Sequence, residues 1–243
     1  MKKLISFTLY GNDPKYVRGM IRNIEMREEF YPDWDIIVYH DNSVQEETLN
    51  YLSENVILRD FTDSGILAAS WRFCAFDEPN VERIIVRDSD SRFTHREANA
   101  VADWEHSNKD LHVMRDHPHH GFSVMGGMWG IKTENKFNNL LDFNMRDSII
   151  RHQGGKREDI TNRNSWSMTD QHFLRDGIYR ALAHPETSKI HASMDYMDRV
   201  AWNNEFWAED FPDPIDPEKY FIGEIFVFDE QGSEQREYQY KER

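Results

Sequence analysis

The chain contains a single cysteine, Cys74, among its 243 residues. An intramolecular disulfide needs two thiols, so no disulfide framework stabilises this fold. The surrounding segment, Ala68-Ala69-Ser70-Trp71-Arg72-Phe73-Cys74-Ala75-Phe76, has the apolar character of a buried helix face, and nothing in it marks a base. We therefore expect Cys74 to be a structural thiol rather than a nucleophile.

Long hydrophobic runs are absent too. No stretch approaches the roughly 20 apolar residues that a membrane-spanning helix requires. The apolar run after Lys2 and Lys3 is too short for a signal peptide, because it meets Gly11 almost at once. We expect a cytoplasmic protein with no integral membrane segment.

Positive charge is scarce: 29 Lys and Arg residues stand against 44 Asp and Glu residues, a formal net charge of −15. Nucleic acids and anionic lipids attract clustered Lys and Arg, so we expect neither as a primary partner. The hydrophobic content of 39% suffices for a core, which indicates a globular protein. A diphosphate bound by so acidic a chain needs a cation or arginines at its site.

Short β-rich apolar runs alternate with longer helical patterns. We expect strands at Leu4–Tyr10, Trp34–Tyr39, Val56–Leu58, Arg83–Val86, Leu111–Met114 and Val124–Ile131. We expect helices at Lys15–Glu29, Gln45–Glu54, Ile66–Phe76, His95–Ser107, Glu134–His152 and Asp170–Leu182. This alternation predicts an α/β fold with a mostly parallel sheet flanked by helices. We interpret residues 1–228 as one domain and residues 229–243 as a polar tail.

Ligands of open parallel sheets bind at the carboxyl ends of the strands. One such end carries Asp88 and Asp90, which follow the apolar run Ile84-Ile85-Val86. Two carboxylates one residue apart on a turn are able to share one hard cation, Mg²⁺ or Mn²⁺, and so bridge it to phosphate oxygens. Aspartates also cap helices and form turns, so this pattern is weak by itself.

A second group follows the strand at Leu111–Met114. Three histidines, His117, His119 and His120, suggest zinc, but Pro118 lies among them and no matching Cys or His pair exists. We expect them to line a polar cleft. The glycines of Gly126-Gly127-Met128-Trp129-Gly130 would then leave room for a sugar, the alternative being a strand packed tightly in the core.

Asp170 and His191 each have a structural interpretation as well as a functional one. Asp170 begins a predicted helix, where a carboxylate favours the positive end of the helix dipole. His191 follows a short predicted strand, Ser188-Lys189-Ile190, where a lone histidine is more often a hydrogen-bonded structural residue than a ligand.

Taken together, these motifs resemble a family. The spaced set Trp71-Arg72-Phe73, Val86-Arg87-Asp88-Ser89-Asp90-Ser91-Arg92, His112-Val113-Met114-Arg115-Asp116-His117-Pro118 and Gly126-Gly127-Met128-Trp129-Gly130 resembles small GT-A glycosyltransferases of bacterial capsule and lipopolysaccharide synthesis and related viral enzymes. The resemblance covers about residues 1–228. It implies a Rossmann-like GT-A sheet and transfer of a sugar from a nucleoside diphosphate sugar to a glycan hydroxyl.

The resemblance also implies roles for single residues. The ligands of Mn²⁺ or Mg²⁺ would be Asp88, Asp90 and His191. The donor would contact Thr8, Tyr10, Asn12, Asp41, Arg72, Arg87, Ser89 and Gly127. The reacting groups would be Asp170, Gln171 and Asp116, with either aspartate as the proton acceptor of an inverting reaction. Under retention, Gln171 or Asp170 would lie beneath the anomeric carbon instead.

Three other classes share parts of this pattern. A haloacid-dehalogenase-type phosphatase places Asp-x-Asp after its first strand, whereas the pair here comes near residue 88. A nucleotidyltransferase on a related fold would want a glycine- and arginine-rich loop after the first strand, which residues 11–18 lack. The third alternative is a non-catalytic module that binds nucleotide sugars.

Overall fold

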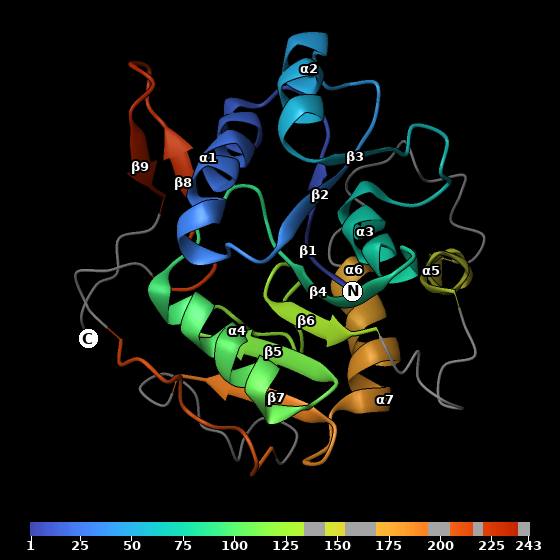
Figure 1. Ribbon diagram of the computed structural model, residues 1–243, viewed down its shortest axis with the longest axis vertical. Helices are drawn as coiled ribbons and strands as arrows, with labels where there is room; N and C mark the ends of the chain where they lie inside the picture. Colours follow the sequence, from blue (N-terminus) through green and yellow to red (C-terminus); the bar gives the residue numbers. More distant parts are fainter. Residues whose placement is uncertain (134–143, 154–168, 194–204, 216–220, 238–243) are drawn as a thin grey trace.

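The computed structural model describes residues 1–133, 144–153, 169–193, 205–215 and 221–237, and the structural statements below concern these residues. Their central sheet has the strand order β3-β2-β1-β4-β6-β5-β7 (Figure 1). The strands are β1 (Lys2–Leu9), β2 (Asp35–His40), β3 (Ile57–Asp60), β4 (Val81–Val86), β5 (Leu111–Arg115), β6 (Trp129–Lys132) and β7 (Ser188–Ala192). Strand β6 runs antiparallel to β4 and β5, and the other pairings are parallel. The predicted mostly parallel α/β sheet is confirmed.

Helices cover both faces of this sheet. They are α1 (Pro14–Phe30), α2 (Glu46–Asn55), α3 (Ala68–Trp71), the 3-10 helix η1 (Arg72–Asp77), α4 (His95–Ser107), α5 (Met145–Gln153), α6 (Thr169–Phe173), the π-helical turn η4 (Leu174–Tyr179) and α7 (Arg180–Leu182). Side chains alternate between faces along each strand. Ile85 of β4 packs in the cluster that includes Met20 of α1 and Trp104 of α4. Ile84 and Val86 pack in the other cluster, with η1, α5 and α6.

Helices α1 and α4 begin close after the carboxyl ends of β1 and β4. The Asp13 side chain accepts a hydrogen bond from the Lys15 amide, and Pro14 occupies the first turn of α1. The Thr94 side chain accepts from the Glu97 amide in the same way at α4. These caps fix where the two helices start, α1 after residues 10–13 and α4 after residues 87–94.

Some predicted boundaries differ from the structure. The expected strand at Val124–Ile131 begins only at Trp129, because the Met128 amide donates to the Met125 carbonyl in a turn at 3.1 Å. The expected helix Ile66–Phe76 divides into α3 and the 3-10 helix η1. Of the expected helix Glu134–His152, α5 covers the described part, and residues 134–143 lie outside the described residues. None of the helices within the described ranges is long and apolar enough to cross a membrane.

The C-terminal hairpin consists of β8 (Phe226–Phe228) and β9 (Glu234–Arg236) and lies beside α1. Arg92 pairs with Glu234 at 2.6 Å, and the Phe226 amide donates to the Asp90 carbonyl at 2.8 Å. Residues 229–237, which we expected to belong to a polar tail, therefore contribute the second strand of a hairpin that contacts the turn after β4.

Candidate functional site

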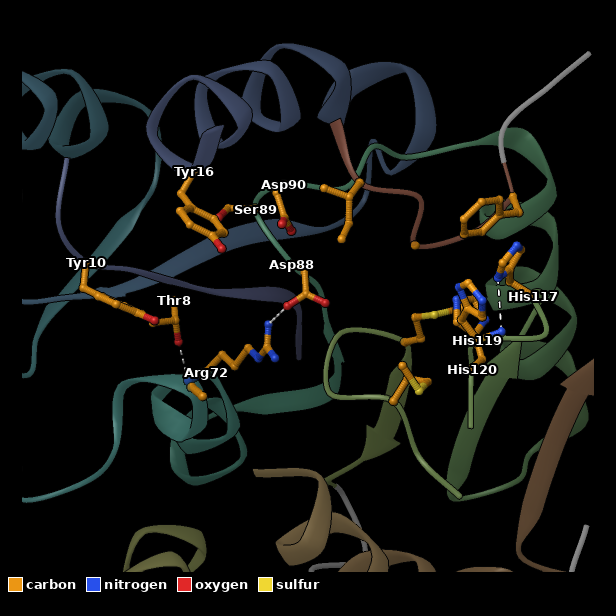
Figure 2. Close-up of a pocket in the computed structure, with 16 residues that line it drawn as sticks. Thr8, Tyr10, Tyr16, Arg72, Asp88, Ser89, Asp90, His117, His119 and His120 are labelled. Carbon is orange, nitrogen blue, oxygen red and sulfur yellow. Dashed lines mark hydrogen bonds and ion pairs between the residues drawn. The ribbon is translucent and has the colours of Figure 1, made fainter. Parts of the chain in front are cut away.

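An open cavity of about 430 Å³ lies at the carboxyl ends of β1 and β4. Its lining consists of Thr8, Tyr10, Tyr16, Ala69, Arg72, Asp88, Ser89, Asp90, His117, His119, His120, Met125, Met128, Phe221, Gly223 and Ile225. Figure 2 shows Asp88 and Asp90 in the middle, with Tyr10 and Thr8 on one side and the three histidines on the other. This is the location that the sheet topology predicts for a ligand.

The turn that carries Asp88 and Asp90 is held by α1. Asn23 of α1 donates to the Ser91 carbonyl at 3.0 Å and to the Ser89 carbonyl at 3.3 Å. A Cβ atom on Gly19 would lie 2.2 Å from the Ser89 carbonyl oxygen, so the helix and the turn meet backbone to backbone. The positions of the two carboxylates are thus fixed by groups outside the cavity.

Each carboxylate of the pair has a cationic partner. The Arg72 guanidinium donates to Asp88 Oδ1, and Lys15 Nζ lies 3.0 Å from Asp90 Oδ2. Burial raises the pKa of the Asp90 carboxyl, and the nearby charge of Asp88 adds to this effect, whereas Lys15 opposes it. The Asp88 side chain is 45% exposed and opens towards the cavity, so it is the more accessible of the two.

Arg72 links this pair to Asp170 at the start of α6. Its guanidinium lies 3.6 Å from Asp170 Oδ2, and its backbone amide donates to Thr8 Oγ1 at 3.1 Å. Burial raises the pKa of the Asp170 carboxyl, and the positive charge of Arg72 opposes this rise. The side chain of Gln171, the next residue, has a buried Oε1 with no hydrogen-bond partner within the described part of the chain.

Gly126 and Gly127 lie directly against the carboxylates of Asp170 and Asp88. A Cβ atom on Gly127 would lie 2.0 Å from Asp88 Oδ2, and one on Gly126 would lie 2.7 Å from Asp170 Oδ2 and 2.8 Å from an Arg72 nitrogen. The sequence suggested that these glycines leave room for a sugar. In the structure they leave room for the acidic side chains themselves.

The residues present fit a divalent cation that also binds a phosphate. In the described ranges no three His, Cys, Asp or Glu side chains form a group that could hold a metal ion by themselves. Mg²⁺ in nucleotide sites is usually held by one or two carboxylates, with phosphate oxygens and waters completing the shell. Asp88 and Asp90 match that donor set, and the space that the missing Cβ of Gly127 leaves is taken by Asp88 Oδ2.

His191, the third expected metal ligand, lies elsewhere. Its Nδ1 is 2.8 Å from Nε2 of His112, and its Nε2–H donates to Asp103 of α4 at 3.1 Å. The ring is fully buried and stacks on Phe211 at 5.4 Å. Both of its nitrogens are therefore engaged within the interface between β5, β7 and α4, and the structure does not bring His191 to Asp88 and Asp90.

Arg87 also points away from the cavity. Its Nε donates to Glu97 of α4 at 2.6 Å, and Glu97 accepts a second hydrogen bond from Tyr31 at 2.7 Å. Arg87 continues the alternation of β4 on the side of Ile85, whereas Asp88 continues it on the side of Val86. Its charge is thus neutralised inside the α1–α4 layer, and the expected donor contact is not supported by its position.

Three other expected site residues hold loops or elements together instead of lining the cavity. Asn12 donates to the Ser43 carbonyl at 2.8 Å, and Asp41 accepts from the Ser43 amide at 3.1 Å. These bonds join the loops after β1 and β2. Asp116 is fully buried and pairs with Arg96 at 2.8 Å, so it is not exposed to the cavity as a proton acceptor would be.

Several residues of the site were not found from the sequence. Tyr16 and Lys15 come from the first turn of α1, where they resemble ordinary surface residues. Phe221 and Ile225 come from a segment more than 90 residues after the last glycine of the Gly126–Gly130 group. No local pattern marks them, because they join the site only through the tertiary fold.

No family model matches the chain, and none of the curated proteins matches it. Solved structures do. S. aureus TarS 1–349 in complex with UDP matches with 15% identity and a TM-score of 0.49, over 79% of this chain and 58% of that one. The mannosyltransferase PcManGT from Pyrobaculum calidifontis in complex with GDP-Man and Mn²⁺ matches with 14% identity and a TM-score of 0.43, over 63% and 52%.

A glycosyltransferase involved in glycosylation of the major capsid of PBCV-1 matches with 12% identity and a TM-score of 0.46, over 80% of this chain and 84% of that one. The matches thus span little more than half the length of TarS 1–349 and of PcManGT. At these identities the likeness concerns the arrangement of the secondary structure. The function is therefore argued from the cavity's own residues.

Proposed function

We propose that the protein is a glycosyltransferase that moves a sugar from a nucleoside diphosphate sugar to a hydroxyl group of a glycan, with Mn²⁺ or Mg²⁺ between Asp88, Asp90 and the diphosphate. The observation that carries this proposal is the pairing of two adjacent carboxylates with Arg72 and Lys15 at the floor of an open cavity. Carboxylates and cations at one spot suit a ligand that brings both a metal ion and phosphate oxygens.

Different parts of the cavity suit different parts of the donor. Tyr10, which is 45% exposed, and Tyr16 offer aromatic surface on the side of Thr8, where we place the nucleoside. The Arg72 guanidinium lies next to Asp88 and is placed to bind a diphosphate oxygen in addition to its two carboxylates. Asn12 and Asp41 contribute by fixing the loops after β1 and β2 around the nucleoside end.

When bound, the divalent cation would act as a Lewis acid that neutralises charge on the departing diphosphate. The chain's own residues hold the reacting groups. Burial raises the pKa of both aspartates proposed as the proton acceptor, so the pKa does not choose between them. We favour Asp170 because it lies 3.6 Å from Arg72, a lining residue of the cavity, whereas Asp116 is held by Arg96 of α4. In an inverting reaction Asp170 would accept the proton of the attacking hydroxyl. In a retaining reaction Asp170 or Gln171 would stabilise the anomeric carbon.

The experiment that tests this function measures release of nucleoside diphosphate from a panel of nucleotide sugars, with Mn²⁺ and with EDTA. We expect slow metal-dependent release from at least one donor by the wild type, because water in the open cavity is able to attack the donor in place of an acceptor hydroxyl. Asp88→Asn should abolish it. A protein that binds donors but releases no diphosphate, with or without glycan acceptors, would be a binding module. Release of pyrophosphate from a nucleoside triphosphate and a sugar 1-phosphate, with formation of a nucleotide sugar, would indicate a nucleotidyltransferase instead.

A further inference from the structure

The end of the cavity opposite Tyr10 is built from two histidines and a phenylalanine. His117 and His120 come from the loop after β5, and Phe221 comes from the segment before β8. The ring of His117 stacks on Phe221 with centroids 4.2 Å apart and planes at 21°, and the ring of His120 lies 5.8 Å from Phe221. We call these three residues the histidine wall, and Figure 2 labels its two histidines.

Asp116 assembles this wall. Its backbone amide donates to His120 Nδ1 at 2.9 Å, and its carboxylate accepts from the Ile222 amide, next to Phe221, at 3.0 Å. The same carboxylate is held by Arg96 of α4. One buried residue therefore orients His120 and brings the Phe221 segment beside it, which gives Asp116 a positioning role.

The hydrogen bonds fix which ring nitrogen carries the proton. His120 Nδ1 accepts from the Asp116 amide, and His117 Nδ1 accepts from the His119 amide at 3.2 Å. A neutral imidazole has one acceptor and one donor nitrogen, so the proton resides on Nε2 in both rings. Burial lowers the pKa of His120 to about 3 and also lowers the pKa of His117, with His119 as a second cause. Both rings are neutral at pH 7.

The charges of the cavity are confined to its centre. Arg72, Asp88 and Asp90 are the charged Asp, Glu, Lys and Arg side chains among the described lining residues, and Arg72 already binds two carboxylates. Around the wall the described lining residues include no Asp, Glu, Lys or Arg. They are Met125, Met128, Gly223, Ile225 and the third histidine, His119. An anionic substituent placed here would lose its hydration without gaining a Lys or Arg partner from the described lining, which is costly.

We propose that the histidine wall is a subsite for an uncharged sugar ring, with His120 Nε2–H donating to a ring hydroxyl and the His117–Phe221 stack packing against the ring. The inference rests on the proposed function and names its substrate class: a neutral hexose or N-acetylhexosamine, rather than a uronate or another anionic sugar. The ring belongs either to the donor or to the acceptor glycan, since both present the same hydroxyls to the wall.

Two variants of His120 test the roles of its two ring nitrogens separately. In His120→Asn the amide oxygen takes the place of Nδ1, so the bond from the Asp116 amide is kept and the Nε2–H donor is lost. In His120→Gln the amide nitrogen takes the place of Nε2, so the donor is kept. Phe221→Leu removes the aromatic face of the wall. Melting temperatures of the three variants, followed by circular dichroism, establish that each is folded.

The donor arm uses calorimetric titration in the presence of Mn²⁺ with UDP, GDP, UDP-glucose, UDP-N-acetylglucosamine, GDP-mannose and UDP-glucuronate. We expect the wild type to bind a neutral nucleotide sugar more tightly than its nucleotide alone, and UDP-glucuronate less tightly than UDP-glucose. The ratio of nucleotide-sugar affinity to nucleotide affinity should fall about 5-fold in His120→Asn, the effect of losing one neutral hydrogen bond. In His120→Gln this ratio should fall less. Binding of the nucleotide alone should be unchanged in both.

The acceptor arm uses methyl glycosides of glucose, galactose, N-acetylglucosamine and glucuronate, with the protein alone and with protein saturated by the nucleotide. Loss of glycoside binding in His120→Asn and Phe221→Leu, with the donor's sugar contribution intact, would support the subsite and assign it to the acceptor. If neither arm responds to any of the three variants, the neutral-sugar subsite is wrong. It is also wrong if the arm that responds prefers the uronate over the glucose compound. Absence of nucleotide binding by the wild type would overturn the proposed function instead, and the glycoside arm would still decide the subsite.

Discussion

A Cβ atom on Gly127 would lie 2.0 Å from Asp88 Oδ2 and 2.5 Å from Asp88 Cγ, so the backbone of the loop before β6 and the carboxylate after β4 occupy adjoining space. Only a residue without a side chain permits this approach. Gly127 and Arg72 thus both lie against the Asp88 carboxylate, the more exposed of the pair, and together they fix its position.

We expect Gly127→Ala to displace the Asp88 carboxylate and to lower kcat/KM for donor turnover roughly 100-fold, the effect of moving a group in an active site by about 1 Å. Gly177→Ala is the matched control, because a Cβ atom there would meet only Phe173 at 3.9 Å. Steady-state rates of both variants check the prediction. Equal rates would show that Asp88 does not need its present position.

Arg72 and Asp170 should be energetically coupled. Arg72→Met leaves the buried Asp170 without its cation and should reduce the free energy of unfolding by about 3 kcal/mol, as when one partner of a buried pair is removed. Asp170→Asn in the same background should restore part of the loss, since no charge is then left buried. Urea unfolding of the four proteins of this cycle measures the coupling. Additive effects within about 0.5 kcal/mol would contradict it.

Substitution of Asp116 and substitution of Asp170 should affect different kinetic parameters. The Asp116 carboxylate accepts from the Ile222 amide, next to Phe221, and pairs with Arg96. A folded Asp116→Asn variant loses the charge of that carboxylate, so it should raise KM more than it lowers kcat. Asp170→Asn should lower kcat by about 100-fold or more if Asp170 accepts the acceptor's proton. Initial rates against donor and acceptor concentration separate the two effects. A pure kcat loss in Asp116→Asn would restore that residue as a candidate base.

The buried His112–His191 pair should make the fold sensitive to acid. Burial lowers the pKa of His191 to about 4 and lowers that of His112 well below its usual range. In the unfolded chain both titrate near pH 6.5. The unfolded state therefore binds more protons below pH 6.5, so the stability that neutral His191 provides is complete above pH 6.5 and is lost as pH falls from 6.5 towards 4.

Replacing His191 by Gln should reduce this pH dependence by up to about 1.4 kcal/mol per pH unit between pH 6.5 and 4.5. His106→Gln, on the exposed side of α4, is the control and should leave it unchanged. The free energy of unfolding by urea, measured at half-unit steps of pH, checks both. A His191→Gln protein with the wild-type pH dependence would show that the histidine already titrates normally in the fold.

The sheet and the location of its ligand-binding edge were predictable because apolar runs of strand length recur with helical patterns between them. The direction of single side chains was less accessible. Arg87 and Asp88 are neighbours in sequence, but strand alternation sends them to opposite faces, and only Asp88 reaches the cavity. Applying that alternation to Ile85 and Val86 would have identified the difference.

The rest of the site could not be derived from local patterns. His191 has the residue type of a metal ligand, but its surroundings are set by His112 and Asp103, which lie 79 and 88 residues away. Phe221 joins the histidine wall through a hydrogen bond between Ile222 and Asp116, 106 residues apart. Such contacts depend on how the whole chain packs, and no short sequence window contains them.

The most direct test of the account is the binding of nucleoside diphosphates to the wild type, Asp88→Asn and Asp90→Asn, followed by thermal unfolding with Mn²⁺ and with EDTA. A ligand that binds only the native state stabilises it by RT ln(1 + [L]/Kd), so at 100 times Kd the gain is about 2.7 kcal/mol. We predict that at least one nucleotide raises the melting temperature of the wild type only with Mn²⁺, and that either substitution removes the shift. A nucleotide-independent melting temperature, or variants that respond as the wild type does, would contradict the assignment of Asp88 and Asp90 to a metal–diphosphate site.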